Sequence, residues 1–405
     1  MLLECLQAAL ARVAGDHAVA SRLRQAPVTA PVGLVAVGKA AQAMTLGAVE
    51  VLGREGIHGG LVISKPGHLD PGRLAALGLE ALEGGHPLPT RGSLEAGRRL
   101  LHWLQRSDCA RLLVLISGGA SSLLEVPVPG LDLDDLRRVG RWLLASGLPI
   151  DDMNRVRKSL SLLKAGGLLR WTRGYELRVL AISDVRGDDP AVIGSGPLTP
   201  DPGLEAAVHA LDLPAWLRDW VARGLEARRG LPATGPPVEI VASLDQAKAA
   251  AAGHARALGV PVQMHREFLE GDAAAAGRRL ARVLCATPPG LQVWGGETTV
   301  RLPPEPGRGG RNQHLALAAA EALAGQPACT LLAAGTDGTD GPTGDAGALV
   351  DGGTWQAIRD LGLDPASALA RADAGSVLEA VGALVDTGPT GTNVMDLVLG
   401  WRSAP

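Results

Sequence analysis

Turns rich in glycine recur along this chain, and several carry a lysine, an arginine or hydroxyl side chains directly after a short apolar run. The first turn joins the apolar run 33–38 to Lys39 and to an expected helix over 39–52. Its spacing nearly matches the GxxxxGK[ST] phosphate loop, but Ala40 replaces the magnesium-binding hydroxyl and the intervening residues read as a strand. A helix start still favours an anion through its backbone N–H groups and dipole. Lys39 is therefore a candidate phosphate-binding residue, with a solvated lysine as the alternative.

Hydroxyl groups and positive charges gather in two further segments. Segment 117–122, SGGASS, follows the apolar run 112–117, and its small residues let backbone amides approach a ligand. A tight strand-to-helix turn also explains its glycines. Segment 154–164 places Asn154, Arg157, Lys158, Ser161 and Lys164 on one face of an expected helix. That face is either solvated or, in a chain of net charge −3, a local site for a carboxylate or phosphate.

Carboxylates follow two other buried runs. Asp184, Asp188 and Asp189 come after the run 176–183, and N-capping of a helix accounts for one of them but not for all three. The turn 335–342, GTDGTDGP, follows the run 330–335, and glycine-rich segments at 295–299 and 307–313 precede it. Spaced aspartates suit Mg²⁺, while threonine hydroxyls and backbone amides suit phosphates. A succession of ordinary turns is the alternative for this segment.

Together these residues are what phosphoryl transfer requires. The protein then has to position donor and acceptor, neutralise the developing charge and hold Mg²⁺. The sequence has no GxSxG nucleophile turn, no HExxH helix and no HRD or DFG protein-kinase motif. The residues therefore favour phosphoryl transfer over acyl transfer or zinc-dependent hydrolysis.

The elements that must position these residues are short apolar strands alternating with alanine-rich helices. Strands are expected at 33–38, 60–64, 112–117, 176–183, 238–243, 260–265, 291–296, 298–303, 330–335 and 396–401, and helices at 39–52, 93–105, 133–144 and 244–258. This alternation is typical of an α/β protein with a largely parallel sheet. The Gly- and Pro-rich segment 230–237 predicts a boundary between two domains, residues 1–232 and 238–405, with a ligand cleft between them.

Composition narrows the function classes. Of 405 residues, 46% are apolar and only 2% aromatic, and the net charge is −3, so a nucleic-acid binder with basic surfaces and stacking aromatics is not expected. The four cysteines are far apart without a CxxC pair, which fits reduced thiols rather than a disulfide framework or a zinc site. The N-terminal segment lacks the pattern of a signal peptide, and no apolar stretch reaches about 18 residues. We therefore expect a cytoplasmic protein without a membrane span.

Eight segments resemble, in the same order, the class II glycerate 2-kinases, whose C-terminal domain is of the MOFRL type. They are VGKAAQAM (37–44), SGGASSLL (117–124), NRVRKSLSLLKAGG (154–167), SDVRGDDPAVIGSGPLTPDP (183–202), GGETTVRL (295–302), GRGGRNQHLALA (307–318), AAGTDGTDGPTGDAGALVDG (333–352) and TGPTGTNVMDL (387–397). The resemblance implies ATP-dependent phosphorylation of D-glycerate at its C2 hydroxyl, giving 2-phosphoglycerate and ADP, with Mg²⁺ as the metal. It also implies a Rossmann-like N-terminal domain, a second α/β domain and an active site in the cleft between them. Glycerate and the nucleotide are then the partners, nucleic acid and membranes are not, and a homodimer is left open.

The resemblance assigns two residues to the active site, and the chemistry of the segments above suggests the others. Lys39 and Arg311 are expected in the active site, each facing the transferred phosphoryl group or the glycerate carboxylate; arginine suits a carboxylate because its fork reaches both oxygens. Asp189 or Asp184 is a hypothesis for the group that orients the C2 hydroxyl. The expected metal ligands are Asp337, Asp340 and Glu297. The expected substrate- or phosphate-binding residues are Ser117, Gly118, Gly119, Ser121, Arg157, Lys158, Gly309, Gly310, Asn312, Thr336, Gly338 and Thr339.

The chain departs from the family at two places, and two other functions compete. Ala120 and Ser121 replace part of a more glycine-rich run, and RADAGS at 371–376 replaces an Asn-Asp-Ser-aromatic phrase, so no substrate contact is carried over to that loop. The main rival is an NAD(P)H-dependent hydroxypyruvate reductase, which needs GxGxxG after the first strand and an acidic residue about 20 positions on. Gly38-Lys39-Ala40 does not supply that fingerprint. The second rival is a sugar-phosphate sensor that binds without catalysis.

Overall fold

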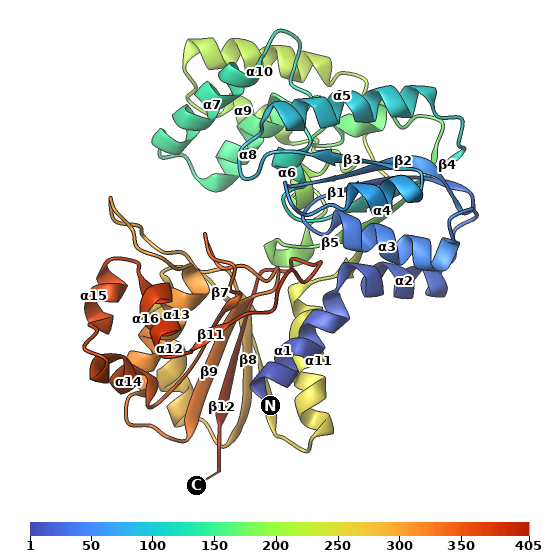
Figure 1. Ribbon diagram of the computed structural model, residues 1–405. Helices are drawn as coiled ribbons and strands as arrows, with labels where there is room; N and C mark the ends of the chain where they lie inside the picture. The colour runs from blue at the N-terminus through green and yellow to red at the C-terminus, as the bar shows by residue number, and fades with distance from the viewer. Residues whose placement is uncertain (405) are drawn as a thin grey trace. The chain divides into compact units, whose positions relative to one another are not determined.

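The computed structural model describes residues 1–404, and the chain forms two compact units (Figure 1). The central unit is Gly15–Val241, and the terminal unit combines Met1–Ala14 with the residues from Ala242 onward. This division differs from the expected domains, 1–232 and 238–405, mainly because helix α1 (Leu2–Val13) belongs to the terminal unit. There α1 lies against helix α11 (Leu244–Ala257) and strand β12 (Asp396–Arg402), and its apolar stripe is buried.

The central unit is built on a six-stranded sheet in the order β3-β2-β1-β4-β5-β6. The strands are β1 (Val32–Val37), β2 (Ile57–Ser64), β3 (Leu79–Glu83), β4 (Arg111–Ile116), β5 (Glu176–Ile182) and β6 (Val238–Ala242). Neighbours from β3 to β5 pair in parallel, and β1 and β4 are buried over almost their whole length. Strands that are buried on both faces have continuous apolar sequences, and this is why the sequence predicts them.

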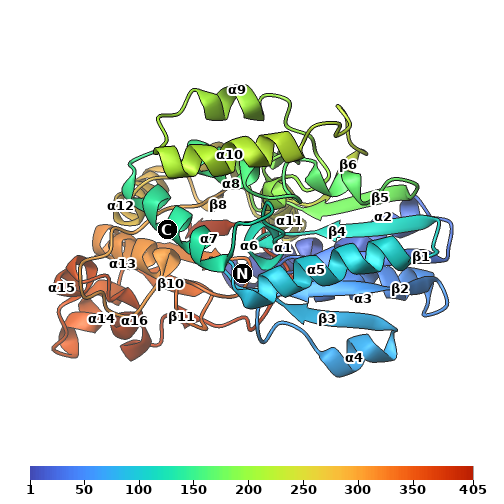
Figure 2. The ribbon, with the colours of Figure 1, turned by 90° about the horizontal axis from the view of Figure 1, so that it is seen from above.

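Helices cover both faces of this sheet. α2 (Gly15–Gln25) and α3 (Ala41–Leu52) lie on one face and α5 (Arg91–Arg106) on the other (Figure 1). Short helices connect the strands: α4 (Pro71–Ala76), α6 (Ala120–Leu123), and the 3₁₀ turns η1 (Gly167–Arg170), η2 (Arg186–Asp188) and η3 (Ile193–Ser195). A separate apolar cluster joins α7 (Leu133–Ala145), α8 (Ile150–Ser159), α9 (Leu204–His209) and α10 (Ala215–Ala227), which Figure 2 shows gathered together.

The terminal unit has a second six-stranded sheet, in the order β11-β10-β9-β12-β8-β7. Its strands are β7 (Val262–Leu269), β8 (Gly290–Gly296), β9 (Cys329–Gly335), β10 (Gly347–Asp351), β11 (Leu384–Val385) and β12. The sheet is mixed: β7 and β8 are parallel, and β12 runs antiparallel to both β8 and β9. The register places Asp396, the first residue of β12, opposite Gly296 and Gly335, the last residues of β8 and β9.

Helices of the terminal unit again form a layer on each face of the sheet. α1 and α11 cover one face, and α12 (Ala273–Ala286), α13 (Arg311–Leu323), α14 (Thr354–Asp360), α15 (Pro365–Ala370) and α16 (Ala374–Ala380) lie on the other (Figure 1). α13 is buried over most of its surface, with Leu315, Leu317 and Leu323 in the core. Its first residue, Arg311, is therefore presented by a helix that packing fixes in place.

Two α/β domains with a Rossmann-like first sheet are confirmed, and two local expectations are corrected. Residues 298–303 do not form a strand; only Thr299 makes an isolated bridge, to Asp272. The helix expected through 154–164 ends at Ser159, so Lys164 lies beyond it. No helix among residues 1–404 is long and apolar enough to cross a membrane.

Candidate functional site

Lys39 and the turn 117–119 lie at the point of the central sheet where the chain order reverses. Strands β1, β2 and β3 extend from the middle of the sheet in one direction, and β4, β5 and β6 extend in the other. Lys39 follows β1 and Ser117 follows β4, its neighbour. Open α/β sheets bind ligands outside the carboxyl ends of the strands at such a point. The structure thus brings together Lys39, Ser117, Gly118 and Gly119, four of the residues that the sequence singled out.

The two turns are fastened to each other. The backbone N–H of Lys39 donates to the carbonyl of Gly118 at 2.9 Å, and the N–H of Ala40 donates to Oγ of Ser117 at 3.1 Å. A side chain at Gly38 would place Cβ 2.1 Å from Oγ of Ser117, and the φ of Gly38 is +128°. Only glycine fits that contact and conformation. The buried hydroxyl of Ser117 therefore holds the backbone on which Lys39 is mounted.

Three other residues of the central unit that were predicted to bind substrate or phosphate make polar contacts within the protein. Oγ of Ser121 lies 2.8 Å from Oγ of Ser195 and joins α6 to η3. Lys158 is buried, and its Nζ lies 3.1 Å from Oδ2 of Asp201. Arg157 donates to Oδ1 of Asn154 at 3.1 Å, and burial lowers the pKa of its guanidinium below the ordinary value.

The expected basic stripe 154–164 is not one continuous helical face. Arg157 and Lys158 lie on the last turn of α8, whereas Lys164 lies beyond the helix and pairs with the buried carboxylate of Glu125. Oγ of Ser161 also donates to Glu125, at 2.5 Å. These contacts give the second half of the stripe a structural role inside the unit.

The two aspartates suggested for orienting the substrate hydroxyl follow β5. Asp184 lies two residues beyond the end of β5, which neighbours β4, so it is near the carboxyl edge that carries Ser117. Asp189 accepts a hydrogen bond from the backbone N–H of Ala191 at 2.8 Å and shapes its own turn. His86, to which no sequence motif pointed, also lies at this edge, in the turn after β3.

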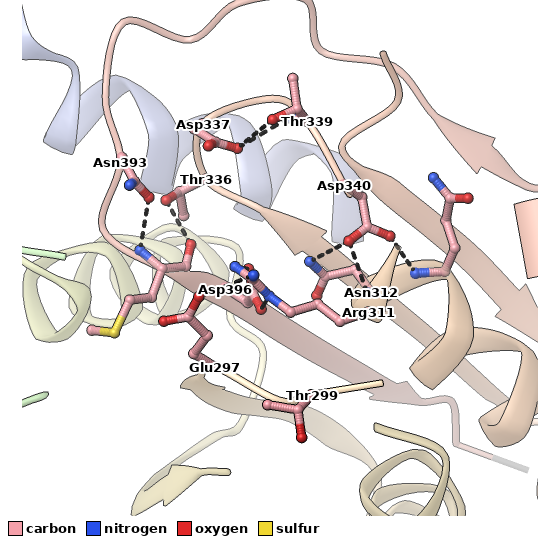
Figure 3. A network of polar contacts seen from close by, with 12 residues as sticks. Glu297, Thr299, Arg311, Asn312, Thr336, Asp337, Thr339, Asp340, Asn393 and Asp396 are labelled. Atoms are coloured by element: carbon pink, nitrogen blue, oxygen red, sulfur yellow. Dashed lines mark hydrogen bonds and ion pairs between the residues drawn. The ribbon is translucent and has the colours of Figure 1, made fainter. Parts of the chain in front are cut away.

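Arg311 is the centre of a second cluster, in the terminal unit (Figure 3). Its Nε and Nη2 donate to Oδ2 and Oδ1 of Asp396 at 2.5 and 2.9 Å, and its Nη1 lies 3.0 Å from Oε1 of Glu297. The Asp396 side chain is only 5% exposed. Burial opposes the charge of Arg311, but the hydrogen bonds and charge of Asp396, aided by Glu297, outweigh it and raise the pKa of Arg311. The guanidinium therefore stays charged and has a fixed orientation.

Asp340 fastens the beginning of α13 to the glycine-rich turn after β9. Its Oδ1 accepts from the backbone N–H of Asn312 at 3.0 Å, and its Oδ2 accepts from that of Gln313 at 2.8 Å. A side chain at Gly310 would place Cβ 2.3 Å from Cγ of Asp340, so only glycine allows this approach. Burial raises the pKa of Asp340 to about 6, although those backbone hydrogen bonds oppose the rise. Asp340 thus caps the helix that presents Arg311.

The turn after β9 is also joined to the segment that leads into β12. Oγ1 of Thr336 donates to the carbonyl of Met395 at 2.6 Å and accepts from the N–H of Val394 at 2.8 Å. Oγ1 of Thr390 donates to the carbonyl of Thr336 at 2.6 Å. Oδ1 of Asp337 accepts from both the N–H and Oγ1 of Thr339, at 3.1 and 3.0 Å. The threonine hydroxyls that suggested phosphate binding therefore stabilise the turn itself.

The expected metal ligands do not gather into one cluster. Within residues 1–404, no three His, Cys, Asp or Glu side chains are grouped so that they could hold a metal ion. Glu297 is paired with Arg311, and Asp340 receives the N–H groups of α13. Sequence reasoning assigned no role to Asp396, although this residue opens the apolar run 396–401 and lies in the segment 387–397 that resembles the family.

Comparison with known proteins extends over both units. A family model described as "Domain of unknown function (DUF4147)" matches residues 1–216, and the MOFRL family model matches residues 290–396. The first match includes Lys39 and the turn 117–119, and the second includes Arg311, Asp340 and Asp396.

Individual relatives match along most of the chain. A D-glycerate 2-kinase of Thermotoga maritima is 36% identical over 411 residues, which cover 99% of this chain and 97% of the relative. A provisionally named hydroxypyruvate reductase of Agrobacterium vitis is 41% identical over 301 residues, covering 71% of this chain and 68% of the relative. The crystal structure of a glycerate kinase from Thermotoga maritima matches with a TM-score of 0.85 and 35% identity, covering 98% of each chain. The chain therefore belongs to the class II glycerate 2-kinase family.

Proposed function

We propose that this protein transfers the γ-phosphoryl group of ATP to the C2 hydroxyl of D-glycerate, giving 2-phosphoglycerate and ADP. The names of its relatives support a glycerate kinase. The structural observation that carries the proposal is Arg311, a charged guanidinium held by a buried carboxylate at the start of a helix. A fixed cation at a helix N-terminus is suited to an anionic substrate group.

Arg311 would bind the glycerate carboxylate or the transferred phosphoryl group. Asp396 occupies the edge of the guanidinium formed by Nε and Nη2, which fixes its plane. Nη1 faces Glu297, whose side chain is 46% exposed and therefore accessible to exchange. An incoming anion replaces Glu297 at Nη1 while Asp396 keeps the guanidinium in place.

Lys39 would bind phosphate oxygens of the nucleotide in the same reaction. It precedes α3 at the carboxyl edge of β1, and the glycine turn 117–119 is bonded to its backbone. The backbone amides of such turns and the N-terminus of a helix attract phosphates without a side-chain charge, and a lysine adds a point charge to them. Lys39 then neutralises charge that develops during transfer.

Mg²⁺ would enter with the nucleotide. A nucleotide-bound Mg²⁺ needs only one or two protein carboxylates, because phosphates and water complete its shell. Asp337 fits this requirement better than Asp340, because Asp340 is 2% exposed and both its oxygens cap α13. The ion would neutralise the phosphates during transfer.

The test is a reaction of the purified protein with ATP, Mg²⁺ and D-glycerate, followed by phosphorus NMR. The proposal expects 2-phosphoglycerate and ADP. A 3-phosphoglycerate signal would move the reaction to the C3 hydroxyl, and the absence of any phosphorylated glycerate would refute the kinase assignment. Parallel reactions with hydroxypyruvate and NADH or NADPH test the alternative function of a hydroxypyruvate reductase. A reductase would oxidise the nicotinamide cofactor, so its absorbance would fall.

A further inference from the structure

His86 lies on a turn that is held from two sides in the central unit. The turn follows β3, and the N–H of Gly84 donates to the carbonyl of Ser64, at the end of β2, at 2.9 Å. The N–H of Gly85 donates to Oγ of Ser93, in the first turn of α5, at 2.9 Å. These bonds fix the backbone directly before His86 at the carboxyl edge of the sheet.

The imidazole of His86 meets the turn that follows β4. Its Nδ1 lies 3.2 Å from Oγ of Ser122. A methyl group at Gly119 would lie 3.3 Å from Nδ1 of His86 and 3.5 Å from Cγ of Lys39. The imidazole, the stem of Lys39 and the backbone of Gly119 therefore converge where the chain order of the sheet reverses.

The two contacts of Ser122 are compatible with a proton on Nδ1 of His86. Oγ of Ser122 lies 3.3 Å from the carbonyl oxygen of Gly119, an acceptor, so Ser122 donates its single proton there. In this arrangement the Nδ1–H of His86 donates to Oγ of Ser122, at 3.2 Å. In a neutral imidazole this leaves the lone pair on Nε2. The side chain is exposed, and histidine is the residue whose ordinary pKa lies nearest neutral pH.

We infer that His86 is the general base that accepts the proton of the glycerate hydroxyl. The inference rests on the proposed function. As the hydroxyl oxygen forms its bond to the γ-phosphorus, Nε2 of His86 takes the hydroxyl proton, and the bond between the γ-phosphorus and the β,γ-bridging oxygen breaks. The electron pair of that bond leaves with ADP, and the imidazolium returns the proton to water. His86 thus joins Asp184 and Asp189 as a candidate for this role, through its position beside the Lys39 turn.

The experiment replaces His86 by alanine and measures a single turnover with enzyme in excess, so that product release does not mask the chemical step. We expect the rate of transfer to D-glycerate to fall about 10²- to 10⁴-fold, the contribution of a positioned general base. The KM for ATP should remain close to that of the original protein. Added imidazole should restore part of the rate, because it can enter the vacated space and accept the proton.

Two further variants separate proton transfer from structure. His102→Ala removes an exposed histidine from α5 and should leave rate and melting temperature unchanged. Ser122→Ala removes the hydroxyl beside Nδ1 of His86 and should slow transfer less than His86→Ala does. A folded His86→Ala variant that keeps its rate, or that imidazole does not rescue, overturns the inference. If the original protein does not phosphorylate D-glycerate at all, the proposed function itself fails, so the two failures are distinguishable.

Discussion

Replacing Asp396 by asparagine tests whether the orientation of Arg311 is essential. Of the three contacts of the guanidinium, two are to Asp396 and one to Glu297, on Nη1. Removing one partner of a fully buried ion pair costs about 3–5 kcal/mol. Asparagine keeps one acceptor and the Arg311 side chain is 35% exposed, so we expect a lower loss of stability, about 1.5–3 kcal/mol, as for a hydrogen bond to a charged group. The guanidinium would then turn toward Glu297.

The effect on activity should exceed the effect on folding. A displacement of about 1 Å in a positioning group costs about 100-fold in rate, so kcat/KM for D-glycerate should fall by about that factor while the KM for ATP changes little. Steady-state kinetics are measured well below the melting temperature of the variant, which calorimetry supplies. Glu321→Gln is the matched control, because it removes an exposed pair with Arg278 at 2.7 Å in the same unit. If Asp396→Asn kept the kcat/KM of the original protein, orientation by Asp396 would be irrelevant to catalysis.

Three other substitutions examine the same reaction. Lys39→Met should lower kcat/KM by about 10²- to 10³-fold, and Lys39→Arg should retain more activity; equal activity in both variants would show that the charge of Lys39 is not needed for the reaction. Glu297→Gln should lower the KM for D-glycerate, because nothing charged then competes for Nη1 of Arg311; a fall in kcat that excess Mg²⁺ reverses would instead make Glu297 a metal ligand. Asp340 has a pKa raised to about 6, so the folded protein binds its proton more tightly than the unfolded chain and gains stability as the pH falls from about 6 to about 4, by about 1.4 kcal/mol per unit of pKa difference. Urea unfolding across this range should show that Asp340→Asn removes this gain, and an unchanged pH profile would contradict the raised pKa.

The sequence was most informative for residues whose position in the site depends only on the end of a strand. Lys39 and Ser117 each follow a recognisable apolar strand, and the carboxyl ends of parallel strands share one edge of the sheet, so their proximity follows from the pattern. Asp396 was different. It lies 85 residues after Arg311, and the antiparallel register of β12 with both β8 and β9 brings it to the guanidinium. No local pattern encodes that register.

Asp340 and the segment 298–303 show why residue type alone does not fix a role in the structure. The aspartates of the turn 335–342 suggested metal binding, but Asp340 caps a helix that begins 29 residues earlier in the chain, at Arg311. Likewise, the segment 298–303 suggested a strand, whereas the chain leaves the sheet after Gly296 and soon meets Pro303 and Pro304, which cannot donate ladder hydrogen bonds. Tertiary partners decided both outcomes.

The position of α1 in the terminal unit has a consequence for synthesis on the ribosome. Its partner α11 begins at Leu244, after the whole central unit Gly15–Val241. At about 5–20 residues per second, translation needs roughly 10–45 seconds to cover that distance. During that interval Leu6, Ala9 and Val13 have no sheet to cover them, so α1 presents an apolar stripe to chaperones. Helix α1 is thus translated long before its native neighbours.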